Sequence, residues 1–205
     1  MTIVSSLIQR IQKTRHGFTD IQKAAEEVFA GHNRPETLSL AKELFASEVP
    51  QARMLATFLF GKLAAKSKQS FVFLRKGVSL DKDWRVQEIL AQAFDQYCKD
   101  NGYEKSLPVI KDWLVDANPN VRRAVTEGLR IWTTRDYFRE HPDVAIYLLS
   151  QLRADESEYV RKSVGNALRD ISRKHKDLVR KELQHWDISN KHTQQTGKLA
   201  GKFLD

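Results

Sequence analysis

The chain has 205 residues, of which 41% are hydrophobic and 29% charged, a balance typical of a soluble globular protein that is long enough for one continuous core. Its apolar runs are far shorter than the roughly 20 residues of a membrane span, and its N-terminus lacks the apolar stretch of a signal peptide. The single Cys98 excludes a disulfide framework, and the scattered histidines show no metal-binding spacing. We expect a cytoplasmic monomer that uses no metal and no cofactor.

Apolar residues recur every three or four positions, while the alternation typical of strands is almost absent, so the pattern predicts an all-α protein. Two amphipathic helices are expected within residues 1–30, as an N-terminal cap. Hairpins of helices follow, because Pro, Asn and Gly residues stand where helices should begin and end. The predicted helices span residues 35–46, 50–65, 68–78, 83–99, 103–115, 118–133, 143–153, 156–174, 177–186 and 191–203.

Four of these predicted helices resemble one another at spacings of 34, 35 and 39 residues. The matching segments are ARMLATFLFG from Ala52, VQEILAQAFD from Val86, VRRAVTEGLR from Val121 and VRKSVGNALR from Val160. A period of this size is typical of helical-hairpin solenoids, in which each hairpin buries its apolar face against its neighbours. We therefore predict an α-α superhelix of HEAT-like repeats as a single domain over residues 1–205, with repeats over 35–174 and a capping hairpin over 175–205.

Equivalent positions of stacked repeats lie side by side on one surface, so each such column of positions describes one surface of the protein. We expect Arg122 and Arg161, which follow Val in two repeats, to pair with a loop acid of a neighbouring repeat. The column one residue later lies on the same helix face as the columns four and seven residues beyond it. Along the stack, from the first repeat to the last, the residues of this face change from apolar, through acidic, to basic and polar. The three columns are Met54, Glu88, Arg123 and Lys162, then Phe58, Gln92, Glu127 and Asn166, then Gly61, Asp95, Arg130 and Arg169.

Trp84 lies four residues before Glu88 and therefore on the same helix face. An indole ring stacks on sugar or base, a carboxylate stabilises a developing oxocarbenium ion, and the guanidinium of Arg123 can hold a phosphate through two contacts. These three residues are the candidate catalytic group. The candidate DNA-binding residues are Arg130, Lys162, Asn166, Arg169 and Arg173.

Each candidate has a structural alternative. Trp84 could pack between helices, Glu88 could be a solvated surface acid, and the basic residues could form a solvated helix face. The other three tryptophans, Trp113, Trp132 and Trp186, stand at spacings typical of a core, and we expect them to be buried.

The segments DWRVQE from Asp83, NVRRAV from Asn120 and YVRKSVGNALRD from Tyr159 resemble the AlkD-type HEAT-like-repeat DNA glycosylases. In that family a Trp-x-x-x-Asp pair and an Arg of the next hairpin line a concave basic groove. They promote hydrolysis of the N-glycosidic bond of cationic N3- and N7-alkylpurines without base flipping. The resemblance places these roles on Trp84, Glu88 and Arg123. This sequence departs from the family at Glu88, which is one methylene longer than Asp, and at Asn166, which replaces a Trp that contacts DNA.

The resemblance favours a DNA-binding protein of alkylation-damage repair that acts on duplex DNA containing alkylated purines, with N-glycosylase activity as its enzymatic form. The first alternative is a non-catalytic HEAT-repeat scaffold that binds an acidic protein partner. The second is a protein that binds branched or bent DNA. The net charge of +8 suits every one of these polyanions, and from residue 161 onward eleven Lys or Arg residues stand against five Asp or Glu.

Overall fold

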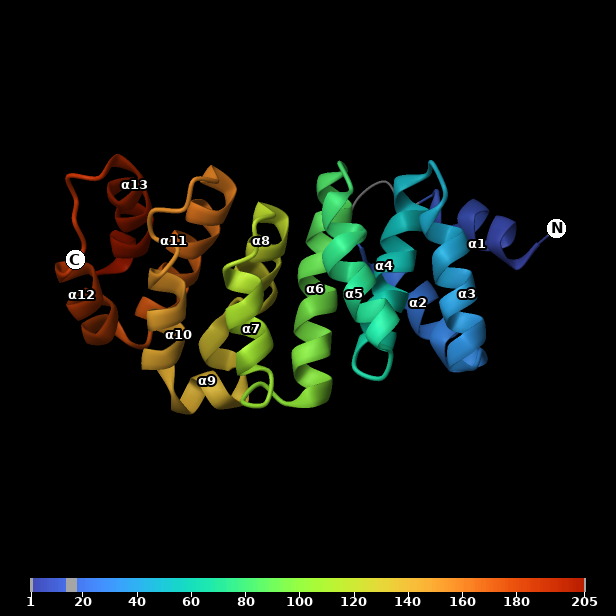
Figure 1. Cartoon of the computed structure of the whole chain (residues 1–205), viewed down its shortest axis with the longest axis horizontal. Helices are drawn as coiled ribbons and strands as arrows, with labels where there is room; N and C mark the ends of the chain where they lie inside the picture. Colours follow the sequence, from blue (N-terminus) through green and yellow to red (C-terminus); the bar gives the residue numbers. More distant parts are fainter. Residues whose placement is uncertain (1, 14–17, 205) are drawn as a thin grey trace. The chain divides into compact units, whose positions relative to one another are not determined.

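The computed structural model describes residues 2–13 and 18–204, and within them the chain is helical and contains no β-strand (Figure 1). The predicted all-α class is therefore confirmed. The described α-helices are α1 (Ile3–Ile11), α2 (Thr19–Gly31), α3 (Arg34–Phe45), α4 (Pro50–Ala64), α5 (Lys68–Lys76), α6 (Trp84–Asn101), α7 (Leu107–Leu114), α8 (Pro119–Gly128), α9 (Asp136–Glu140), α10 (Pro142–Ser150), α11 (Glu158–Ser172), α12 (Lys176–Gln184) and α13 (Lys191–Ala200). The short 3-10 helices are η1 (Val78–Leu80), η2 (Trp132–Thr134) and η3 (Gly201–Phe203).

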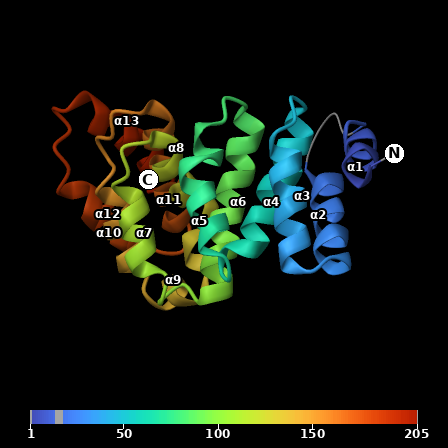
Figure 2. The same ribbon diagram turned by 45° about the vertical axis from the view of Figure 1, so that its right-hand side comes forward.

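The chain forms two compact units, Met1–Asp100 and Asn101–Asp205. In the first unit α3, α4 and α5 follow one another as packed hairpin helices (Figure 2). Helices α1 and α2 also contact α4. In the second unit α8 packs on α7 and α11, and α11 also contacts α10, α12 and α13. No helix in the described residues combines the length and the apolar character that a bilayer-spanning segment needs.

Local sequence chemistry explains where the helices begin. Asn33 accepts a hydrogen bond from the backbone N–H of Glu36 at 3.0 Å, and the Glu36 carboxylate accepts one from the N–H of Asn33 at 2.9 Å, which completes a capping box. Pro50 and Pro119 occupy the first turns of α4 and α8, where the missing N–H costs nothing. Gly102, with φ of 86°, follows the end of α6 in the left-handed conformation that glycine adopts most readily.

Aromatic side chains fill the core of each unit. In the first, the Phe73 ring lies 5.1 Å from the ring of Phe45 and 4.7 Å from that of Phe60. In the second, Trp113 and Trp132 are fully buried, and Trp186 is nearly so. The prediction that these three tryptophans are packing residues is therefore confirmed.

The predicted helix over residues 118–133 is wrong at its end, because α8 stops at Gly128. The chain then turns so that Trp132 is buried, donates from Nε1 to the carbonyl oxygen of Thr126 at 3.3 Å, and packs 4.9 Å from the Phe138 ring. If α8 continued as far as residue 133, the Trp132 indole could not reach back to the carbonyl oxygen of Thr126. Consequently Arg130 lies in the connection after α8 instead of on a helix face.

A ladder of arginines ties successive loops together within each unit. Arg122 donates from Nε and Nη2 to the two carboxylate oxygens of Asp155, both at 2.7 Å, as the sequence predicted. Arg53 makes the equivalent pair with Asp81 at 2.6 and 3.3 Å. The prediction for Arg161 is wrong in its partner, which is the amide oxygen of Gln195 at 3.0 and 2.8 Å. Arg161 faces α13, whose Gln195 supplies an amide oxygen. In the other two pairs, Asp81 and Asp155 supply a carboxylate at this place.

Gly61 of α4 allows α6 to approach closely. A Cβ atom at this position would lie 2.7 Å from the Cβ and 2.9 Å from the Cα of Ala93, closer than packed atoms tolerate. We expect Gly61→Ala to lower the free energy of unfolding by about 1–3 kcal/mol, measured by urea denaturation. Gly31→Ala is the matched control, because a Cβ there has no neighbour within 4 Å. Equal stability of the two variants would contradict this account.

Candidate functional site

Trp84 is the first residue of α6, and its side chain is 67% exposed. The loop before it is fixed by two ion pairs. Asp81 binds Arg53 and also accepts a hydrogen bond from the N–H of Asp83 at 2.8 Å. Asp83 in turn pairs with Arg85 at 2.7 Å, and the hydrogen bonds from Arg85 hold the pKa of the Asp83 carboxyl below its ordinary value. The exposed indole therefore follows a loop that is held by two ion pairs.

Glu88 follows Trp84 by one helical turn and is half-buried. The structure thus brings these two predicted residues together on one face of α6. The exposed ring of Trp84 offers a flat apolar surface, and the neighbouring carboxylate offers a negative charge close to it. This pair can stack on a ring system and stabilise a positive charge that develops beside it.

In the corresponding column of α4 the side chains are apolar and buried. Met54 is 2% exposed and Phe58 is 8% exposed, and α1 and α2 pack on this helix. The apolar end of the column is therefore internal to the first unit. Its polar positions, including Glu88, lie on later helices.

Arg123 lies on α8 in the second unit and is half-buried. Its helix is fixed against α11 by a buried hydrogen bond between the hydroxyl oxygens of Thr126 and Ser163 at 2.6 Å. Trp84 and Glu88 belong to the first unit. The second unit supplies the guanidinium and the remaining predicted DNA-binding residues.

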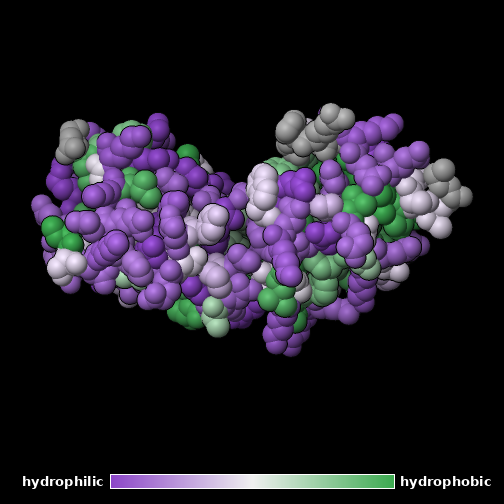
Figure 3. Space-filling view, turned by 90° about the horizontal axis from the view of Figure 1, so that it is seen from above, coloured by the Kyte–Doolittle hydropathy of each residue, from purple (hydrophilic) through white to green (hydrophobic). Residues whose placement is uncertain are grey.

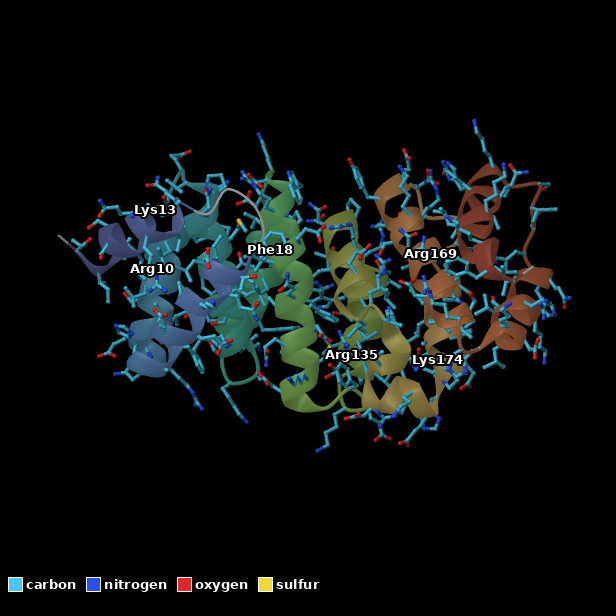
Figure 4. All side chains as sticks on the ribbon, turned by 180° about the vertical axis from the view of Figure 1, so that it is seen from behind. Arg10, Lys13, Phe18, Arg135, Arg169 and Lys174 are labelled. Atoms are coloured by element: carbon cyan, nitrogen blue, oxygen red, sulfur yellow. The ribbon has the colours of Figure 1, made fainter. Side chains whose placement is uncertain are left out.

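One face of α11, continued by its C-cap residue Arg173 and called the α11 face below, carries four of the predicted residues at positions i, i+4, i+7 and i+11. Lys162 is exposed and makes a surface ion pair with Glu158 at 2.6 Å, one helical turn before it. An exposed pair of this kind is screened by solvent and contributes little to stability, so the ammonium can exchange Glu158 for another anion at little cost. The other three residues of this α11 face are Asn166, Arg169 and Arg173, and Figure 4 shows Arg169 on the helix.

Arg130 is held by acids of the second unit. Its Nε donates to Asp170 at 2.7 Å, and its Nη1 lies 3.4 Å from Glu127. Burial lowers the pKa of Arg130, but the hydrogen bonds and charges of these two carboxylates outweigh burial and leave the pKa raised. Arg130 is therefore a charged residue whose charge is largely balanced inside the unit.

Arg169 and Arg173 share an aromatic neighbour that sequence reasoning missed. The ring centroid of Phe203 lies 4.7 Å from Cζ of Arg173 and 5.8 Å from Cζ of Arg169. Residues 191–203 were predicted as one helix of a capping hairpin, which gave no reason to place a ring beside α11.

The face of the molecule seen in Figure 3 is mostly hydrophilic, with smaller apolar areas. Among the described residues, no group of three or more His, Cys, Asp or Glu could hold a metal ion.

A protein-family model described as DNA alkylation repair enzyme matches residues 17–201. The chain belongs to this family. The predicted resemblance to AlkD-type proteins is confirmed by the crystal structure of AlkD2 from Streptococcus mutans, which is 48% identical. Its TM-score is 0.97, and the match covers 98% of this chain and 97% of AlkD2.

Other similar proteins differ from this chain in sequence identity and in the length that the match covers. The crystal structure of smu.31 from Streptococcus mutans UA159 is 45% identical over the whole of both chains, with a TM-score of 0.94. The alkylpurine DNA glycosylase AlkC from Pseudomonas fluorescens, bound to DNA containing an abasic site analog, is 23% identical with a TM-score of 0.53. That match covers 100% of this chain and 65% of AlkC, and AlkC shares the fold. The uncharacterized protein YhaZ of Bacillus subtilis (strain 168) is 37% identical over 105 residues, which are 49% of this chain and 29% of YhaZ.

Proposed function

We propose that the protein binds duplex DNA containing alkylated purines and acts in the repair of alkylation damage. The observation that carries the proposal is the α11 face, on which Lys162, Asn166, Arg169 and Arg173 follow one another along one side of a helix. Positions i to i+11 of a helix span about 16 Å. Successive phosphates of a DNA strand rise by about 3.4 Å, so this length matches several phosphates of one backbone.

The charge of the α11 face supports a polyanion over a neutral partner. Two acids that lie close to these residues are already engaged, Glu158 by Lys162 and Asp170 chiefly by Arg130. Arg173 is exposed, and its guanidinium lies over the ring of Phe203 and not against an acid. Membership of the DNA alkylation repair family makes nucleic acid the better supported polyanion.

The test measures duplex binding by fluorescence anisotropy over a series of salt concentrations. We expect binding at low salt, with log Kobs falling linearly with log salt, and Lys162→Gln making that slope shallower by about 0.9 because one phosphate contact is lost. Lys111→Gln, an exposed lysine of α7, is the control and should leave the slope unchanged. A protein that shifts no duplex at low salt would instead fit the scaffold for an acidic protein, and a preference for branched DNA would fit the structure-specific binder.

We propose hydrolysis of the N-glycosidic bond of cationic N3- and N7-alkylpurines as a second function, favoured by the exposed Trp84 one turn from Glu88 on α6. The positive charge of such a base already weakens its bond to the sugar, so moderate electrostatic help is enough. Trp84 stacks against the damaged nucleotide, and Glu88 stabilises the oxocarbenium ion and positions water. Arg123 holds a backbone phosphate and so fixes the register of the strand.

The departure at Asn166 weakens one contact to DNA. An Asn side chain can hydrogen-bond to DNA but cannot stack, and a stacked base contributes about 1–3 kcal/mol of binding. Phosphate contacts by the neighbouring Lys162, Arg169 and Arg173 do not depend on that position. Binding and excision are therefore proposed as separable properties, each with its own measurement.

A further inference from the structure

The C-terminal 3-10 helix η3 lies against α11, α12 and α13 in the second unit. Small residues make this possible, because a Cβ atom at Gly165 of α11 would lie 2.7 Å from the Cβ of Leu199 and 2.9 Å from the carbonyl oxygen of Thr196. Thr196 also donates from its hydroxyl to the carbonyl oxygen of Arg153 at 2.7 Å. The close α11–α13 contact therefore determines where η3, which directly follows α13, meets the helix face.

The end of η3 is also held by a hydrogen bond. Arg180 of α12 donates from Nη2 to the carbonyl oxygen of Leu204 at 2.7 Å and from Nη1 to Asp177 at the same distance. Phe203 lies between these anchored points and is half-buried. Its ring is thus placed by the fold and is not a loosely attached terminal side chain.

The two arginines beside this ring differ in their other contacts. Arg169 has one long hydrogen bond from Nη2 to Asp170 at 3.4 Å, and its buried Nε–H has no acceptor among the described residues. Asp170 is already the 2.7 Å partner of Arg130. Arg173 is exposed, and its Cζ lies 4.7 Å from the ring centroid of Phe203. Arg173 therefore retains donors for an external anion, and at Arg169 the weakly bound Nη groups, not the buried Nε–H, are the donors available to one.

We infer that Phe203 is a positioning residue that orients Arg173, and with it Arg169, to bind one phosphodiester of the bound DNA strand. This inference rests on the proposed DNA binding. A guanidinium stacked on an aromatic face is restricted to few orientations, and its planar fork matches two phosphate oxygens. The face of the ring carries no charge, so Phe203 contributes through the arginines it orders. The C-terminal segment thereby belongs to the DNA-binding surface instead of being only a cap.

The test compares the salt dependence of duplex binding for Phe203→Leu and Arg173→Gln. We expect Arg173→Gln to make the slope shallower by about 0.9, because it removes one phosphate contact. Phe203→Leu removes no charge, yet we expect it to weaken binding about two- to fivefold and to make the slope shallower in the same direction. Phe203→Tyr keeps the aromatic face and should retain the wild-type slope, which separates this role from a general effect on folding.

Two further variants decide whether Phe203 acts through Arg173. In the double variant Phe203→Leu/Arg173→Gln, we expect a loss of affinity smaller than the sum of the two single losses, whereas independent contacts would give additive losses. Phe29→Leu is the control, because it removes a Phe that lies 5.6 Å from Nζ of Lys62 in the first unit and should leave the slope unchanged. Additive losses, or an unchanged slope in Phe203→Leu, would overturn this inference alone. Absence of duplex binding by the wild type would overturn the proposed function together with it.

Discussion

Replacing Glu88 by Gln is expected to reduce the release of methylated purine from alkylated duplex DNA by about 10²–10³-fold, to the spontaneous rate, with little change in DNA affinity. The substitution keeps the size of the side chain and removes its charge. A neutral amide cannot stabilise the oxocarbenium ion, while stacking by Trp84 and the phosphate contacts persist. The measurement is chromatographic detection of the released base under single-turnover conditions, beside anisotropy with the same duplex.

Two companion variants sharpen this experiment. Asp95→Asn removes the same charge two turns further along the same α6 face and should release purine at the wild-type rate. Glu88→Asp withdraws the carboxylate by about 1.5 Å to the length that the AlkD-type pattern has, and we expect release to rise, because displacements on this scale change rates by about a hundredfold. Release by the wild type no faster than the spontaneous rate would show that the glycosylase proposal is wrong and leave DNA binding as the function.

Most of the fold could be predicted from the sequence because local signals and the repeat agree. Capping residues such as Asn33 and prolines such as Pro50 and Pro119 determine helix starts by chemistry that acts within one turn. The apolar period determines which face is buried. The Arg122–Asp155 pair could also be predicted, because a repeated position implies a repeated contact. Arg53 stands at the same position of the first repeat, so this signal was present for it as well.

Other features depend on tertiary contacts that the sequence period does not encode. The early end of α8 follows from the burial of Trp132, whose partner Phe138 lies in a different helix. The place of Phe203 beside Arg173 follows from the Gly165 contact between α11 and α13. The sequence thus predicts which residues share a helix face, but not which residues of other helices they contact. For the same reason the catalytic roles of Trp84, Glu88 and Arg123 stay predictions that kinetics must test.

Arg122→Met is expected to cause the largest loss of stability among single substitutions of the ladder. Its guanidinium makes both 2.7 Å bonds to Asp155 and donates from Nη1 to the carbonyl oxygens of Asp116 and Ala117 at 2.7 and 3.0 Å. The Asp155 side chain is 5% exposed, so methionine leaves a buried carboxylate without its cation. Loss of one partner of a buried pair costs about 3–5 kcal/mol, equivalent to a fall of about 6–20 °C in Tm for a protein of this size.

Arg139→Met is the matched control for this prediction, because it removes an arginine from the same unit. The Arg139–Asp136 pair spans 3.2 Å, and its side chains are 58% and 86% exposed. Such a pair contributes at most about 1 kcal/mol, so differential scanning calorimetry should separate the two variants clearly. Similar Tm values would mean that apolar packing between α8 and α11 holds these hairpins together and that the ladder only orders the loops. A large difference would identify the ladder as a main source of stability. The stabilising role would then belong to the column of Arg122, and the next column, with Arg123 and Lys162, would be the one whose residues serve binding.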